Sequence, residues 1–333
     1  MTSMSMKIST EEYIHGGTQK DDYKPSEAES CDCPLCGGKD YRKLHTERGV
    51  LGIVRCDGCG IIYVNPRLKE PEKVYWGDAE TYFEEARLIF LGKLPHHRDP
   101  NYDYDLRIVR KYKPEGRFLD VGTNMGFFLR RARGKKWELF GVEPSPALSE
   151  FARKYFALNV KTAYLENAGF EDDYFDIVTM TDVFEHIGDP ESMLYHVRRI
   201  IKPDGIVLIK VPNGNYSLMK LRLSRLLGKS GQYDIFDSYE HLVHYSVKTL
   251  TLMLEKHGFK VIERYLPPPV QIPVWHHLVG HYYQYPSPAI LDFKHVMLRR
   301  IFHLIGRLES LIPAGYSPYF PPSIAVVARE KTR

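Results

Sequence analysis

Two pairs of closely spaced cysteines lie near the start of this 333-residue chain. Cys33 and Cys36 form the first pair, Cys56 and Cys59 the second, and a glycine follows each pair. Thiolates at this spacing are typical of a tetrahedral zinc site in which protein fills all four positions. The sequence therefore predicts a structural zinc ion, with iron as the alternative that sulfur ligands leave open. Cys31, the fifth cysteine, could exchange with Cys33 or be a free thiol.

A glycine turn follows a predicted buried strand further along the chain. Its residues run from Asp120 through Gly122 and Asn124 to Gly126. Glycines here let the backbone approach a ligand closely, and the helix that follows presents free N–H groups. Glu143, at the end of the next predicted strand, could bind two ribose hydroxyls.

The spacing of this turn argues against a dinucleotide cofactor. A dinucleotide fingerprint that starts at Gly122 needs glycines at positions 124 and 127. Asn124 and Phe127 stand there instead. The turn therefore predicts a nucleotide-like ligand of another kind.

The elements that must position these residues alternate between strands and helices. Apolar runs bounded by turn residues predict strands, and helical spacing predicts helices between them. Such alternation implies an α/β fold with a mostly parallel sheet covered on both faces. The predicted strands are Arg117–Val121, Leu139–Val142, Phe175–Met180, Ile206–Val211, Phe259–Tyr265 and Ser323–Ala328, and the predicted helices begin at Phe127 or span Pro146–Phe156, Ser192–Ile201 and Val247–His257.

The chain divides into four predicted parts. Residues 1–29 are polar and read as a disordered tail. Residues 30–68 form the zinc-binding unit, residues 69–105 a helical connector, and residues 106–333 the main domain. Insertions at about 213–245 and 267–322 interrupt that domain. The amphipathic stretch 290–312 is expected to pack on the core, with contact to a membrane surface or a lipid-linked sugar as the alternative.

Four motifs in order resemble those of class I methyltransferases that use S-adenosylmethionine (SAM). They are Asp120-x-Gly122-x-x-x-Gly126, "GVEPSP" at 141–146, "FDIVTMTDVFEHIGDP" at 175–190 and "IKPDGIVLIKVPN" at 201–213. The resemblance implies a Rossmann-like sheet of seven strands whose last strand is antiparallel. It also implies SAM as the cofactor.

The resemblance also implies roles for individual residues. Asp120 and Gly122 would face the methionine part of SAM, and Glu143 its ribose. Thr181 and Asp182 would border the place where the methyl acceptor meets the sulfonium, and Leu165 and Glu166 are the candidates beside adenine. Asn124 replaces the usual middle glycine of the turn. Asparagine tolerates a positive φ better than most residues, and its side chain could touch the methionine part.

The order of zinc unit, "CGIIYVNPR" and methyltransferase motifs is similar to a group of bacterial enzymes. These enzymes methylate intermediates of sugar, polysaccharide and secondary-metabolite pathways. The acceptor is therefore expected to be a small molecule, such as a nucleotide- or lipid-linked sugar. Alternatives are an RNA or protein methyltransferase that uses the zinc unit for recognition, and a non-catalytic scaffold that binds SAM.

Methyl transfer to a hydroxyl or an enolisable carbon requires a base, and histidine is the usual one near neutral pH. The segment "YEHLVHYS" at 239–246 resembles one in zinc-bearing sugar C-methyltransferases, where a Glu-His pair lies in the active site. By this resemblance His241 is the base and Glu240 its neighbour, although Ser238 stands where that family has a tyrosine. His186 lies just beyond a predicted strand and near the same pocket. O-methylation and C-methylation both stay open.

Composition narrows the class of protein further. The net charge of +4 is modest and no basic stripe is present, so a nucleic-acid partner is not expected. All five cysteines lie within residues 31–59, which indicates a local metal site in a reducing compartment rather than disulfides. Neither a signal peptide nor a spanning apolar run is visible, so the chain is expected to be cytoplasmic.

Overall fold

A computed structural model describes residues 22–71, 79–93, 96, 98–228, 234–268, 289–309, 311–312 and 317–331. Within them, seven strands form one mixed sheet in the order β12-β13-β10-β9-β6-β7-β8. β13 is antiparallel to both of its neighbours, whereas β6 to β10 run parallel. The predicted fold class, with its antiparallel last strand, is therefore confirmed. The strands are β6 (Glu115–Val121), β7 (Lys136–Val142), β8 (Asn159–Lys161), β9 (Phe175–Thr181), β10 (Ile201–Pro212), β12 (Phe259–Tyr265) and β13 (Ser323–Glu330).

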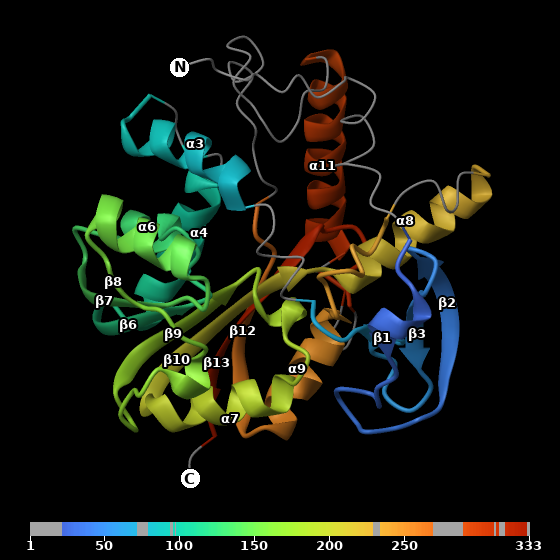
Figure 1. Ribbon diagram of the computed structural model, residues 1–333, viewed down its shortest axis with the longest axis horizontal. Coiled ribbons are helices and arrows are strands. Elements are labelled where there is room, and N and C mark those ends of the chain that lie inside the picture. The colour runs from blue at the N-terminus through green and yellow to red at the C-terminus, as the bar shows by residue number, and fades with distance from the viewer. Residues whose placement is uncertain are drawn as a thin grey trace.

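Helices cover both faces of this sheet (Figure 1). Alternate side chains of each strand point to opposite faces, so β6 sends Phe118 to one core and Leu119 to the other. The first core contains α4 (Asp99–Tyr112) and α5 (Phe127–Ala132), and the second contains α7 (Pro190–Ile200) and α9 (Val247–Lys256). Burial on both faces explains why β9 and β10 are nearly continuous apolar runs.

Helix α7 begins two residues before the predicted Ser192. Asp189 caps the helix, because its carboxylate accepts the Ser192 N–H at 3.0 Å. Pro190 occupies the first turn, where its missing N–H costs nothing. Ser145 caps a second helix, α6 (Pro146–Phe156). This helix packs against α3 (Ala79–Phe90) in a separate buried cluster.

The cysteine unit is a small antiparallel sheet, and it includes a strand from far along the chain. β2 (Tyr41–Glu47), β3 (Leu51–Cys56) and β4 (Ile62–Val64) form three of its strands. The fourth is β11 (Val243–His244), which pairs with β4. A short helix η1 (Pro25–Glu27) precedes β1 (Ala28–Glu29), which pairs with β5 (Arg67–Leu68). Both η1 and β1 lie within the segment 1–29 predicted as a tail, and residues 1–21 of that segment lie outside the described part.

The two predicted insertions each contain a helix. α8 (Gly214–Leu226) lies in the first and α11 (Ala289–Glu309) in the second. The expectation that the amphipathic stretch packs on the core is only partly right. Phe302 contacts Phe320, but Ile301, Leu304 and Leu308 are exposed on α11. Among the described helices, none is long and apolar enough to cross a membrane.

Candidate active site

The glycine turn joins β6 to α5 at the carboxyl end of the sheet. Gly122, Asn124 and Gly126 all have positive φ values, of 68°, 51° and 84°. A Cβ on Gly122 would lie 2.6 Å from Val183, and one on Gly126 would lie 2.5 Å from Leu158. Both glycines are therefore required by backbone conformation and by packing. Asn124 adopts the left-handed conformation, as its residue type allows.

Asp120 lies beneath this turn rather than on its surface. Its side chain is 2% exposed, and it accepts hydroxyl hydrogens from Thr179 at 2.6 Å and Thr123 at 2.8 Å. Burial raises the pKa of Asp120 to about 6, although the two hydroxyls oppose that rise. The carboxylate therefore holds the turn in position from below.

Glu143 follows β7 and is also nearly inaccessible, at 2% exposure. Its two oxygens accept the N–H groups of Asn124 and Ser145, each at 2.9 Å. Burial raises the pKa of Glu143, and these two N–H groups oppose that rise. Each carboxylate oxygen can accept a second hydrogen bond. A ribose could donate from two adjacent hydroxyls to this remaining acceptor capacity, so the Glu143 carboxylate suits a nucleoside-type cofactor.

The two residues proposed beside adenine lie in η2 (Leu165–Asn167). Leu165 is 3% exposed and packs in the core that contains α7 and α9. Glu166 is exposed. Their adenine contact stays a prediction.

Thr181 and Asp182 mark the carboxyl end of β9. Asp182 has a positive φ of 57° and pairs with Arg98 at the start of α4. Lys210 of β10 lies 3.9 Å from the same carboxylate. Burial opposes the ionisation of Asp182, but Lys210 and Arg98 outweigh it and lower its pKa. Asp182 is therefore a carboxylate at neutral pH.

Lys210 links this edge of the sheet to α4. Its side chain is 5% exposed, and its ammonium lies 2.9 Å from Asp105, whose other oxygen accepts the Tyr265 hydroxyl hydrogen at 2.8 Å. Sequence reasoning missed Lys210, Asp105 and Arg98. The signal was available for Lys210, because a lysine within the apolar run "GIVLIKVP" must find a buried partner.

Two histidines predicted from distant motifs meet beside Asp182. His186 belongs to η3 (Phe184–His186), and its ring centroid lies 4.8 Å from that of His241. The Nδ1 of His186 donates to the carbonyl oxygen of Glu240 at 2.9 Å. Glu240 therefore contributes its backbone to this cluster.

Both imidazoles are neutral at neutral pH. Burial and the neighbouring His241 lower the pKa of His186 to about 3. Burial also lowers the pKa of His241 to about 4, against the opposing effect of the Asp182 carboxylate. A neutral imidazole that donates from one nitrogen carries a lone pair on the other.

Glu185 is a further buried group that sequence reasoning missed. It is 2% exposed, and neither carboxyl oxygen has a hydrogen-bond partner within the described residues. Burial and the Asp182 carboxylate raise the pKa of Glu185 well above its usual range. Glu185, His186 and His241 also offer ligand atoms within 4.8 Å of one another, a set that a divalent cation could use.

The four predicted metal ligands come together in the N-terminal sheet. The Sγ atoms of Cys33 and Cys59 lie 3.5 Å apart, as do those of Cys36 and Cys56. All four sulfurs lie within 4.8 Å of one another, which fits tetrahedral zinc with bonds of about 2.3 Å. None of these cysteines forms a disulfide. Cys31 lies outside this set, with its Sγ 3.6 Å from the Val64 carbonyl.

Comparisons with known proteins agree with this geometry. Residues 96–264 match the methyltransferase domain family. The chain is 26% identical over 189 residues to an uncharacterized protein of Methanocaldococcus jannaschii, covering 57% of this chain and 80% of that protein. A chain of the complex between the Haloferax volcanii Trm112 methyltransferase activator and a methyltransferase shares the fold, with a TM-score of 0.50 at 17% identity over 76% of this chain and 97% of that one.

Two relatives of known activity match over shorter stretches. The ubiquinone biosynthesis O-methyltransferase of Alkalilimnicola ehrlichii is 31% identical over 105 residues, which cover 30% of this chain and 42% of that enzyme. The C-methyltransferase NovU of Streptomyces niveus is 27% identical over 150 residues, which cover 44% of this chain and 33% of that enzyme. The matched family spans half of the chain and includes the glycine turn, Glu143 and the histidine cluster. The chain therefore belongs to the methyltransferase domain family and is a SAM-dependent methyltransferase.

Proposed function

We propose that this enzyme methylates a small-molecule acceptor, a sugar or a polysaccharide precursor, on oxygen or carbon. The observation that carries the proposal is the pair of neutral imidazoles, His186 and His241, beside the Asp182 carboxylate. This pair lies at the carboxyl end of the sheet, where open α/β folds bind their ligands. Proton removal from a hydroxyl or a carbon acid needs a neutral base there.

The donor side of the site is assigned to the glycine turn. Bound SAM supplies an activated methyl group on a positively charged sulfur. In the proposal, Asp120, Gly122, Asn124 and Gly126 shape the pocket for its amino-acid end. Glu143 accepts the ribose hydroxyls. Thr181 and Asp182 border the methyl group, where a carboxylate suits a positive sulfur.

The acceptor side is assigned to His241, with His186 and Glu240 as its neighbours. In its neutral form His241 has a lone pair on one ring nitrogen, and this nitrogen is the proton acceptor in the proposal. The Asp182 carboxylate raises the proton affinity of His241 and stabilises the imidazolium that forms. Glu240 fixes His186 through its backbone carbonyl.

The choice of acceptor class rests on two supporting observations. The relatives of known activity carry out O- and C-methylation, and one is named for ubiquinone biosynthesis. The N-terminal sheet brings four thiolates together, and the order of this unit and the methyltransferase motifs resembles that of sugar-pathway enzymes. In the proposal the four cysteines hold a structural zinc ion.

Two measurements test the proposal. Calorimetry with S-adenosylhomocysteine should show binding, and a thermal-shift screen of nucleotide-linked sugars should find an acceptor that is then methylated. In His241→Ala, turnover should fall by about 10²- to 10⁴-fold with cofactor affinity nearly unchanged. His257→Ala, a partly buried histidine after α9, is the matched control and should keep wild-type turnover. Loss of cofactor binding by the wild type, or full activity of His241→Ala, would contradict the proposal.

A cation at Glu185, His186 and His241 is the alternative means of activation. A cation would take the lone pair of the neutral His241 ring, which is the lone pair that His241 needs as a base, so the two roles exclude each other. Turnover that added Mn²⁺ does not raise, and that Zn²⁺ alone restores after EDTA treatment, supports the base. Turnover that EDTA abolishes and Mn²⁺ restores assigns the three side chains to a cation.

A further inference from the structure

The segment that carries His241 is held from one side by the N-terminal unit. We call residues 22–71 the N-terminal module and residues 234–244 the acceptor loop. Glu47, the last residue of β2, is 4% exposed and lies against this loop. Its Oε1 accepts the N–H groups of Ile235 at 2.7 Å and Phe236 at 2.8 Å, and its Oε2 accepts that of Ser238 at 3.1 Å. One buried carboxylate thus fixes three backbone groups just before His241.

The same module also fixes the loop just after His241. The Val64 N–H donates to the Leu242 carbonyl at 3.0 Å. Val243 pairs with Tyr63, and His244 with Ile62, in the β4–β11 ladder. The loop therefore has backbone contacts to the module on both sides of the proposed base.

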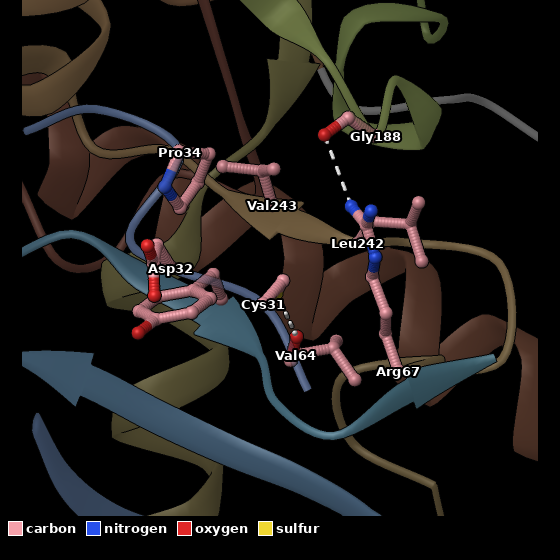
Figure 2. A pocket seen from close by; sticks show the side chains of 9 residues that line it. Cys31, Asp32, Pro34, Val64, Arg67, Gly188, Leu242 and Val243 are labelled. Carbon is pink, nitrogen blue, oxygen red and sulfur yellow. Dashed lines mark hydrogen bonds between the residues drawn. The ribbon is translucent and has the colours of Figure 1, made fainter. Parts of the chain in front are cut away.

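Side-chain contacts extend this interface. Arg48 pairs with Asp234 at the start of the loop, and its guanidinium lies 5.2 Å from the ring centroid of Tyr239. Figure 2 shows Cys31 and Pro34 of the module around Leu242 and Val243, with Arg67 reaching across to the Gly188 carbonyl at 3.0 Å. Gly188 lies two residues after His186, so the module contacts both histidine segments.

The backbone from Phe236 to Ser238 connects Glu47 to His241. Glu47 binds the N–H groups of Phe236 and Ser238, and the carbonyl oxygen of Asp237 between them accepts the backbone N–H of His241 at 2.9 Å. This contact fixes the backbone from which the His241 ring projects. The charged carboxylate of Glu47 makes stronger hydrogen bonds than a neutral acceptor would. A glutamine has only one acceptor oxygen, so it could not accept from all three N–H groups in the same way.

We infer that the N-terminal module positions the base of the methyltransferase site, with Glu47 as the positioning residue that acts on His241 through the backbone of residues 236–238. The four-cysteine site holds the module in the shape that presents Glu47. The inference rests on the proposed function, in which His241 accepts the proton. It assigns the module a role in the rate of methyl transfer and none in cofactor binding.

Glu47→Gln tests this role. The variant should lower kcat by about tenfold or more, with affinity for S-adenosylhomocysteine within about twofold of the wild type. Glu27→Gln, an exposed carboxylate of the same module, is the matched control and should leave kcat unchanged. The amides of Ile235, Phe236 and Ser238 should exchange faster with deuterium in Glu47→Gln, whereas those of residues 120–126 should not change. A wild-type kcat in folded Glu47→Gln, or an equal loss of cofactor affinity and kcat, overturns the inference.

A second measurement covers the case in which Glu47→Gln does not fold. Wild-type protein is then compared with and without its bound zinc. Faster exchange at residues 235–238 on zinc removal, with residues 120–126 still protected, supports the inference, and unchanged exchange overturns it. These exchange data do not depend on turnover. If His241→Ala kept full activity, the proposed function would fail while the link between Glu47 and the loop would still be measured.

Discussion

At the residue scale, charge and burial divide the site into two kinds of group. Asp182 is kept ionised by Lys210 and Arg98, and His186 and His241 are kept neutral by burial. Burial and Asp182 raise the pKa of Glu185 well above its usual range. A carboxylate and two neutral imidazoles within one cluster suit proton transfer from an acceptor near a sulfonium.

The pKa of His241 predicts the pH dependence of methyl transfer. A base must be deprotonated to act, and a pKa of about 4 means that His241 is deprotonated throughout the usual working range. We therefore expect kcat/KM to stay flat between about pH 5.5 and 8 and to fall only toward lower pH. In Asp182→Asn the loss of the carboxylate should lower the pKa of His241 further and make it a weaker base, with kcat/KM reduced by about tenfold.

The pH–rate profile of the wild type and of Asp182→Asn, measured with the same acceptor, checks this expectation. His257→Ala serves as the reference for changes unrelated to the cluster. An acidic limb centred near 6.5, the ordinary value for histidine, would show that His241 is not buried during turnover.

At the element scale, the sequence predicted the parts of the site that rest on local patterns. The glycine turn follows from Gly122 and Gly126, and Asn124 adopts the positive φ that its residue type tolerates. Contacts between distant segments left no such pattern. Glu47 binds backbone groups, such as that of Phe236, which lie about 190 residues further along the sequence. The strand β11 has only two residues, which is too short to be predicted as a strand. A hydrogen bond between a side chain and the backbone of a distant segment leaves no pattern in the sequence, so only the folded structure reveals it.

The ion pair between β10 and α4 is an element-scale contact with a measurable effect. Lys210 is 5% exposed and Asp105 is fully buried, so Lys210→Met leaves a carboxylate buried without its cation. Breaking a buried pair from one side costs about 3–5 kcal/mol. We expect the free energy of unfolding to fall by that amount in urea denaturation. The turn between β9 and η3 should also lose order, because Lys210 helps to hold Asp182.

Lys113→Met is the control for this prediction. Lys113 pairs with Asp204, whose side chain is 77% exposed, and such pairs contribute at most about 1 kcal/mol. Equal destabilisation by the two substitutions would mean that lost lysine packing, and not the buried carboxylate, explains the effect.

At the scale of the whole molecule, the N-terminal module and the methyltransferase sheet share one hydrophobic core. Val54, Cys56 and Tyr63 of the module belong to the same buried cluster as Leu119 of β6 and Met180 of β9. One buried cluster crosses the predicted boundary at residue 68, and the module also packs with α8 in a second cluster. A shared core and the β4–β11 ladder couple the stability of the two parts.

This coupling predicts that the protein unfolds in one transition whose midpoint depends on zinc. Zinc at the four cysteines should contribute directly to folding free energy, because the unfolded chain has no preformed site. Removing it with a chelator should lower Tm by roughly 10 °C or more, while S-adenosylhomocysteine should raise the same transition. Cys31→Ser should melt as the wild type does, because Cys31 lies outside the four-sulfur cluster. Differential scanning calorimetry tests this prediction. Two unfolding transitions, of which the chelator shifts one and S-adenosylhomocysteine shifts the other, would show that the module folds independently of the sheet.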